Sequence, residues 1–267
     1  MWNCRGAGGP LTIPQLKEVI HLHSPSVVFL CETKNKERYM KQVQNRIKFE
    51  HSFVVNPKGR AGGLALFWNE GVQLLDIHSS DWYIAARVED KDTSDYWWLV
   101  GLYASTDERV RVQQWEIIGE KKREWGEKWV VVGDFNDICS NGEKWGGRER
   151  SEGSFREFNS FISANDQVDI GCKGVPWTWS NTWEGEGEIR ERLDRCLGSV
   201  GWVQKYENAV VEHIEIEASD HCLLLMDTDL KQRRAKRRFF FDQRWARDEA
   251  SIAVIKRAWG LEQNGSR

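Results

Sequence analysis

The chain has 267 residues, of which 40% are hydrophobic, enough for one large domain or two small ones with a full core. It has no run of the roughly 18 apolar residues that cross a membrane, and its N-terminus lacks a signal-peptide core, so we expect no membrane partner. The six cysteines are scattered and form no C-x-x-C pair, which indicates reduced, mostly buried thiols and an intracellular protein.

The net charge of −3 is unevenly distributed. Residues 231–267 hold 11 Lys and Arg against 4 Asp and Glu, so this tail carries +7 and residues 1–230 carry −10. An acidic body is not a simple DNA-binding composition, but acidic clusters can hold a divalent cation. The basic run 231–238 favours nucleic-acid binding or a nuclear localisation signal, and the nucleus is the suspected compartment; a charged linker explains the run at least as well.

The first 36 residues predict a strand end, a glycine-rich loop, a helix and a second strand. Only Met1 and Trp2 precede Asn3, so we expect the first strand to be truncated. Thr12 is expected to cap a helix that Ser24-Pro25 ends. The apolar run 27–31 is typical of a buried strand, and Glu32 follows it directly.

The middle of the chain alternates helical and strand patterns. Helices are expected at 36–48 and 108–126, the second with Val112, Trp115, Ile117 and Ile118 on its inner side. Strands are expected at 53–55, 64–68, 72–78, 83–88 and 96–103. The turn 56–63 carries Lys58 and Arg60, and the last of these strands ends at Tyr103.

The stretch 129–136 contains the clearest candidate for a site. Its apolar residues predict a strand buried on both faces, which stops at Gly133 and is followed by Asp134 and Asn136. Alternation places these two side chains on the same side of the chain. A buried carboxylate and amide need partners or a ligand, although Asp and Asn are also common in ordinary turns at strand ends.

The remaining patterns complete an α/β sandwich. A polar loop at 141–153, which carries Arg148, precedes a helix at 155–162, and strands are expected at 177–181, 192–197, 210–216 and 222–226. Strands outnumber helices, which predicts a four-layer α/β sandwich of two packed, mainly antiparallel sheets flanked by helices. We expect this domain to span 1–229, followed by a basic linker and helical tail at 230–267.

Polar side chains from six segments sit at or within the ends of these predicted strands. They are Asn3, Glu32, Tyr103, Asp134, Asn136, Asp194, Asp220 and His221. Each alone has a plain structural explanation: a turn, a surface residue, a bonded core tyrosine, a salt bridge within 192–195 or a core histidine. Together they indicate a single site at one edge of the sheets.

This set of side chains suits metal-assisted hydrolysis of a phosphodiester. Carboxylates such as Glu32 and Asp220 provide the hard oxygens that Mg²⁺ or Mn²⁺ prefers. Such a metal neutralises charge on the phosphate. His221 can donate to a phosphate oxygen if its other nitrogen binds a carboxylate, for which Asp194 is the natural candidate. Cysteine and histidine are too dispersed to indicate zinc.

The order of short motifs is similar to the endonuclease/exonuclease/phosphatase superfamily. The motifs are Trp2-Asn3 with Gly6, Glu32-Thr33, Gly101-Leu102-Tyr103, Gly133-Asp134-Phe135-Asn136, Trp177-Thr178-Trp179, Arg192-Leu193-Asp194-Arg195 and Ser219-Asp220-His221. Within that superfamily, residues 3–6, 60–65 and 177–181 resemble the apurinic endonuclease-like domain of plant non-LTR retrotransposons. The resemblance spans residues 2–226, and Arg5 stands where repair-type abasic endonucleases tend to carry an acidic residue.

The resemblance implies a role for each matched residue. Glu32 would be the main metal ligand with Asn3 beside it, and Asp220 a second metal-site residue. Tyr103 would orient the phosphate, and Asp134 would position or deprotonate the attacking water with help from Asn136. His221, paired with Asp194, would stabilise the transition state. Lys58, Arg60 and Arg148 lie on loops that can face a phosphate backbone, although solvated loop charge is an equally good explanation.

The leading hypothesis is a Mg²⁺-dependent DNA endonuclease that nicks target DNA for retrotransposition. We expect a monomer, here a retroelement-derived fragment, with the reverse transcriptase domain of the parent element absent. Two alternatives remain open. One is a phosphatase acting on small phosphate esters, and the other is a catalytically decayed or domesticated nucleic-acid-binding remnant.

Overall fold

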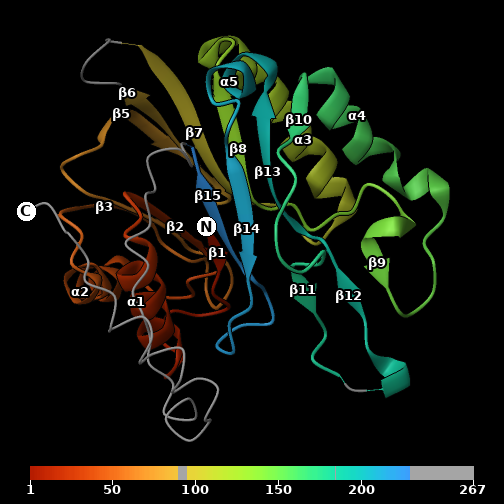
Figure 1. The fold of residues 1–267 in the computed structure, drawn as a ribbon, viewed down its shortest axis with the longest axis horizontal. Coiled ribbons are helices and arrows are strands. Elements are labelled where there is room, and N and C mark those ends of the chain that lie inside the picture. Colours follow the sequence, from red (N-terminus) through yellow and green to blue (C-terminus); the bar gives the residue numbers. More distant parts are fainter. Residues whose placement is uncertain (90–94, 184, 229–267) are drawn as a thin grey trace, which may run out of the picture. The chain divides into compact units, whose positions relative to one another are not determined.

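Two β-sheets form the centre of the computed structural model, which describes residues 1–89, 95–183 and 185–228 (Figure 1). The first has the order β1-β2-β4-β3 and the second the order β10-β13-β8-β7-β6-β5. The strands of the first sheet are β1 (Trp2–Asn3), β2 (Val27–Cys31), β3 (His51–Val55) and β4 (Leu64–Trp68). Those of the second are β5 (Gln73–Ser79), β6 (Tyr83–Glu89), β7 (Tyr96–Tyr103), β8 (Trp129–Asp134), β10 (Gln167–Asp169) and β13 (Asp194–Ser199).

Most neighbouring strands in these sheets are antiparallel. The parallel pairs are β1 with β2 and β7 with β8. Five helices accompany the sheets in the described part of the chain: α1 (Thr12–His23), α2 (Glu37–Ile47), α3 (Glu108–Trp125), α4 (Arg156–Ala164) and α5 (Val200–Lys205). Short 3-10 turns occupy Asn141–Glu143, Glu152–Phe155 and Gly185–Gly187.

Three apolar clusters show how the layers stack. Helices α1 and α2 pack on the outer face of the first sheet, where Leu16 and Met40 meet Leu30. Phe29 and Val130 belong to the cluster between the sheets. Helices α3 and α4 cover the outer face of the second sheet in a third cluster. The order helix, sheet, sheet, helix confirms the predicted four-layer sandwich, and Figure 1 shows the two helix pairs on opposite sides.

A hairpin of β14 (Val210–Ile214) and β15 (Leu223–Asp227) forms a separate two-stranded sheet next to β1. The Leu224 amide donates to the Met1 carbonyl at 2.8 Å, and Trp2 Nε1 donates to the His221 carbonyl at 3.2 Å. Strand β1 is therefore held between β2 and β15. This arrangement brings Asn3 next to the segment that carries His221.

Two helix details differ from the sequence-based expectations. Thr12 is the first residue of α1 and does not cap it, because its hydroxyl donates to the Gly6 carbonyl and the N-cap is Leu11. Ile117 is 40% exposed, although we expected it on the inner face of α3. The buried face of α3 instead includes the polar Arg111 and Gln114, whose side chains find partners inside the protein.

A small third sheet lies beside the sandwich and consists of β11 (Trp179–Ser180), β12 (Arg190–Glu191) and β9 (Lys144–Trp145). The sequence did not single out β9, β10, β12 or α5. The three strands are two or three residues long and the helix has only six residues, so none of them is long enough to show a periodic pattern.

The sequence also led to predictions about membrane spans, cysteines and the C-terminal tail. No helix in the described part of the chain has the length and apolar character to cross a membrane. All six cysteines are free, and four of them are buried. The basic linker and helical tail predicted at 230–267 fall outside the described residues.

Candidate active site

The strand ends singled out from the sequence meet at one edge of the sandwich. Asn3 pairs in register with Cys31, which directly precedes Glu32. Asp134 lies opposite Tyr103 on one side and Asp194 on the other. Register alone therefore places three of the polar residues side by side across β7, β8 and β13.

Four buried side chains form a continuous chain of polar contacts. Asn3 Nδ2 donates to Asp134 Oδ2 at 2.9 Å and lies 3.4 Å from His221 Nε2. His221 Nδ1 lies 2.8 Å from Asp194 Oδ2, and His221 Nε2 lies 3.8 Å from Asp134 Oδ2. The imidazole is thus placed between two carboxylates, and all four side chains are almost completely shielded from solvent.

The electrostatics of this chain favour an extra proton. Burial, followed by the negative charge of Asp194, raises the pKa of Asp134 to about 7. Burial alone lowers the pKa of His221, but the charges of Asp194 and Asp134 outweigh it and raise that pKa to about 9. These shifts favour the protonated form of His221 and make Asp134 a better proton acceptor than an ordinary carboxylate.

Glu32 forms a second group with Tyr103 and two cations, Arg5 and Lys34. Tyr103 Oη donates to Glu32 Oε1 at 2.7 Å, and burial followed by this hydrogen bond raises the pKa of Tyr103. The tyrosine therefore stays protonated. Glu32 Oε2 lies 3.4 Å from Arg5 Nε and 3.4 Å from Lys34 Nζ. Glu32 has a positive φ of 50°, so a tight turn directs it out of β2.

Asp220 joins the same group through Arg5. Arg5 Nη1 lies 3.0 Å from Asp220 Oδ2, and Trp179 Nε1 donates to that oxygen at 3.0 Å. Arg5 thereby links the turn after β2 to the turn before β15. In the sequence, Arg5 stood out only because repair-type abasic endonucleases tend to carry an acidic residue at this position. Nothing in the sequence indicated that Arg5 bridges Glu32 and Asp220.

The arrangement offers suitable oxygen ligands for a divalent cation. Among the described residues, Glu32 Oε2 and Asp194 Oδ1 are buried oxygens without a hydrogen-bond partner. Carboxylate oxygens of Asp134 and Asp194 and a nitrogen of His221 also lie within 4.8 Å of one another. Asp194 bonds to His221 through Oδ2, and Glu32 bonds to Tyr103 through Oε1, so each of these carboxylates keeps one oxygen that a hard cation could use.

Asn136 supports the site through its backbone and its amide. Its N–H donates to Asp134 Oδ1 at 2.9 Å, and its Nδ2 donates to the Ala104 carbonyl at 2.8 Å. Strand β8 ends at Asp134 and Asn136 has a positive φ of 49°, so strand alternation does not extend to Asn136.

Two hydroxyls that the sequence did not single out fix the backbone around the residues of the candidate site. Thr178 Oγ1 accepts the amides of Leu193 and Asp194 at 2.9 and 2.8 Å. Ser219 Oγ donates to the Asn3 carbonyl at 2.8 Å and accepts the His221 amide at 3.1 Å. Their positions inside Trp177-Thr178-Trp179 and Ser219-Asp220-His221 were the only signal in the sequence.

The three predicted substrate-binding cations contact none of the residues above in the described part of the chain. Lys58 pairs with Asp81, and Arg60 and Arg148 are exposed. The loop that carries Lys58 and Arg60 is nevertheless attached to the site, because the Gly62 and Gly63 carbonyls accept the amides of residues 34 and 33 at 3.0 Å. Lys58 and Arg60 therefore lie on a loop that is attached to the Glu32 turn.

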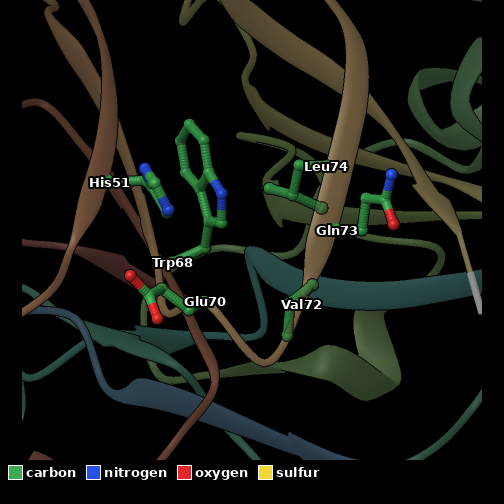
Figure 2. A pocket seen from close by; sticks show the side chains of 6 residues that line it. All are labelled: His51, Trp68, Glu70, Val72, Gln73 and Leu74. Carbon is green, nitrogen blue, oxygen red and sulfur yellow. The ribbon is translucent and has the colours of Figure 1, made fainter. Parts of the chain in front are cut away.

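A separate pocket lies at the opposite edge of the sheets, where β4 ends and β5 begins (Figure 2). The His51 ring stacks on Trp68 with a centroid distance of 5.4 Å. Glu70, Val72, Gln73 and Leu74 complete the lining. None of the strand-end residues described above lines it.

Comparison with known proteins agrees with this geometry. The model of the endonuclease/exonuclease/phosphatase family matches residues 2–221, which include every polar residue of the site. No curated protein sequence matches this chain.

Several solved structures share the fold. A 3′ phosphatase, NExo, from Neisseria bound to a product DNA hairpin has a TM-score of 0.67 at 16% identity, covering 85% of this chain and 97% of that chain. The AP endonuclease LMAP from Leishmania major has a TM-score of 0.64 at 16% identity, covering 84% and 85%.

The endonuclease domain of TRAS1, a telomere-specific non-LTR retrotransposon, has a TM-score of 0.61 at 14% identity, covering 84% of this chain and 94% of that domain. At these identities the structural likenesses show the fold, whereas the family model extends over most of the chain. The chain therefore belongs to the endonuclease/exonuclease/phosphatase family.

Proposed function

We propose that the protein is a divalent-metal-dependent phosphodiesterase that nicks DNA. The observation that carries this proposal is the buried chain Asn3–Asp134–His221–Asp194, which lies at the same sheet edge as the Glu32–Tyr103 pair. A proton acceptor, a cationic donor and partly uncommitted carboxylate oxygens are what phosphodiester hydrolysis requires in one place.

Each side chain has a role in that reaction. A divalent ion, Mg²⁺ or Mn²⁺, held by Glu32 and Asp220 would neutralise negative charge on the phosphate. Asp134 accepts a proton from the attacking water, which its raised pKa permits. His221, kept cationic by Asp194, donates from Nε2 to a phosphate oxygen as negative charge increases there.

The other site residues position these groups. Asn3 fixes Asp134 through its Nδ2, and the neutral Tyr103 holds Glu32. Asn136 fixes the second oxygen of Asp134 through its backbone amide. The reacting carboxylates therefore need little rearrangement when the substrate arrives.

DNA is the proposed substrate because the loops of the domain present exposed cations and aromatic rings. Arg60 and Arg148 are exposed and available for phosphate contacts, Lys58 is exposed but pairs with Asp81, and Arg190 stacks over Trp177 at 4.1 Å from the ring centroid. Trp183, on the loop between β11 and β12, is 68% exposed and can stack on a base or sugar. The fold shared with a DNA-bound phosphatase and with an AP endonuclease supports this choice.

A role in target-site nicking during non-LTR retrotransposition is the narrower form of the proposal. The fold shared with the TRAS1 endonuclease domain and the motif sequence described above support it. In that setting a reverse transcriptase encoded by the same element would use the nick, and the enzyme would act in the nucleus.

A comparison of DNA with phosphate monoesters as substrates tests the proposal. We expect the purified protein to convert supercoiled plasmid to the nicked form with Mg²⁺ and to stop when a chelator is added. Turnover of inositol phosphates or a 3′-phosphorylated oligonucleotide should be much slower. Faster release of phosphate from these monoesters than nicking of plasmid would favour a phosphatase instead, a function that the similarity to the 3′ phosphatase makes worth measuring.

A further inference from the structure

Arg5 places a fixed positive charge between the two carboxylates assigned to the metal. Its Nε lies 3.4 Å from Glu32 Oε2 and its Nη1 lies 3.0 Å from Asp220 Oδ2. Its backbone N–H donates to Asn3 Oδ1 at 3.2 Å, and its φ is +47°. The backbone geometry at residue 5 therefore directs the guanidinium into the site.

The remaining contacts of these carboxylates show which oxygens are available. Tyr103 occupies Glu32 Oε1, while Glu32 Oε2 accepts no hydrogen bond and faces only the charges of Arg5 and Lys34 among the described residues. Asp220 Oδ2 is shared between Arg5 and Trp179. Arg5 therefore lies beside Glu32 Oε2, the oxygen of Glu32 left for a divalent ion, and also occupies one of the two oxygens of Asp220. The other oxygen of Asp220, Oδ1, lies 3.5 Å from the Ser219 hydroxyl.

A metal ion and this guanidinium cannot share the two carboxylates without strong repulsion. Unit charges a few ångströms apart interact by several kcal/mol at the effective dielectric of a partly buried site, and a divalent ion doubles that repulsion. The side chain of Arg5 is 47% exposed, so it can move toward solvent when the metal arrives.

We propose that Arg5 is an internal counter-cation that competes with the divalent ion for Glu32 and Asp220, so that metal binding expels the guanidinium. This inference rests on the proposed function, since it uses the same metal-binding carboxylates. Arg5 keeps the carboxylates compact and charge-balanced when no metal is bound, and it lowers the affinity of the site for the metal.

A purely structural salt bridge is the alternative. Exposed and half-exposed ion pairs contribute little to stability, so replacing Arg5 should not unfold the protein. The two explanations differ in the sign of the effect on metal affinity. A structural bridge predicts unchanged or weaker binding once the site loosens, whereas competition predicts tighter binding.

Direct titration of the metal-free protein with Mn²⁺, without DNA, tests the competition. We expect Arg5→Gln to bind Mn²⁺ about tenfold more tightly than the wild type, and Lys34→Gln, which removes a charge near Glu32 alone, to show a smaller gain. Arg60→Gln is the matched control, because Arg60 is exposed on the adjacent loop and pairs with neither carboxylate in the described structure; its affinity should not change.

Two further variants make every result decisive. Glu32→Gln should lose Mn²⁺ binding, which locates the metal. Arg5→Lys keeps the charge but cannot reach both carboxylates, so its Mn²⁺ affinity should lie between those of the wild type and Arg5→Gln. If thermal unfolding shows that Arg5→Gln is misfolded, Arg5→Lys replaces it as the test.

The failure of this inference can be told apart from that of the proposed function. Equal or weaker binding by Arg5→Gln, with binding still lost in Glu32→Gln, overturns the competition and leaves the metal site intact. No Mn²⁺ binding by any folded variant overturns both.

Discussion

Asp194 determines the chemical state of His221. It lies completely buried at the first position of β13, with its Oδ2 2.8 Å from His221 Nδ1, and its charge counteracts the effect of burial on the pKa of the imidazole. A buried histidine without such a partner would tend to be neutral, with a single N–H and no carboxylate to accept from Nδ1 and leave Nε2 as a cationic donor to a phosphate oxygen. Asp194 therefore acts through His221.

Asp194→Asn tests this dependence. Removing the negative charge should lower the pKa of His221 from about 9, since burial then acts with less opposition. We expect the nicking rate at neutral pH to fall by about 100-fold or more. NMR titration of the His221 ring and single-turnover nicking measure the two effects.

Asp166→Asn serves as the control, because Asp166 is an exposed partner of Lys122 and should affect neither measurement. An Asp194→Asn protein with a normal His221 pKa and a reduced nicking rate would show that Asp194 acts by some other route.

At the scale of an element, alternation along strand β13 places a residue of the candidate site next to a residue of the structural core. Asp194 faces the site, while its neighbour Arg195 is fully buried against α4, 5.5 Å from the Phe158 ring centroid. Arg195 pairs with Glu143 and, at 3.0 Å, with Asp169. The sequence suggested a structural salt bridge as the alternative role of Asp194. The motif 192–195 does form salt bridges, but Arg192 and Arg195 make them, with Glu143 and Asp169.

Glu143→Gln tests the contribution of this buried ionic cluster to stability. We expect the free energy of unfolding at neutral pH to fall by about 3 kcal/mol. The buried charge of Arg195 then keeps Asp169 as an acidic partner but loses Glu143. Chemical denaturation measures the loss. Glu149→Gln, at an exposed position of the same loop, should have little effect.

The stability difference between the wild type and Glu143→Gln should depend on pH. Burial alone raises the pKa of Glu143, but hydrogen bonds and charge from Arg195 outweigh it and hold that pKa below its ordinary value of 4.5. A depressed folded-state pKa gives stability that is present above 4.5 and is lost as the pH falls below it. The gap in melting temperature between wild type and Glu143→Gln should narrow below pH 4.5, and a gap independent of pH would contradict this account.

At the scale of the whole molecule, close contact between the two sheets positions the site. Phe29 of β2 packs directly on Gly101 of β7, where an added Cβ would lie 2.5 Å from the ring. Glu32 and Tyr103 lie two or three residues further along these strands and hydrogen-bond across the gap. The spacing of the sheets therefore sets the distance between the groups that the two sheets contribute.

Gly101→Ala should widen that spacing. We expect a loss of about 1–3 kcal/mol in unfolding free energy from overpacking, and weaker catalysis because Tyr103 moves relative to Glu32. Denaturant unfolding together with nicking kinetics measures both changes. Combining Gly101→Ala with Phe29→Leu, which removes ring atoms at the contact, should restore part of the stability; no recovery would place the strain elsewhere.

The sequence predicted the layers and the strand-end residues because both depend on local patterns. Apolar runs such as 27–31 and 96–103 coincide with β2 and β7, and the polar residue at each end was visible directly. Strands β9, β10 and β12 escaped notice because they are only two or three residues long. The bridge made by Arg5 and the buried ionic pairs of Arg195 depend on contacts between distant segments, which no periodicity reports.

Loss of plasmid nicking in Asp134→Ala is the most direct test of the central claim that this buried chain hydrolyses phosphodiesters. Asp134 connects Asn3, His221 and Asn136, and it is the group proposed to accept the proton of the attacking water. The account predicts Mg²⁺-dependent nicking by the wild type and a rate at least about 1,000-fold lower in a folded Asp134→Ala protein. Equal nicking by the two proteins would contradict the mechanism, and no nicking by a folded wild type with Mg²⁺ would mean that the chain retains the site without its activity.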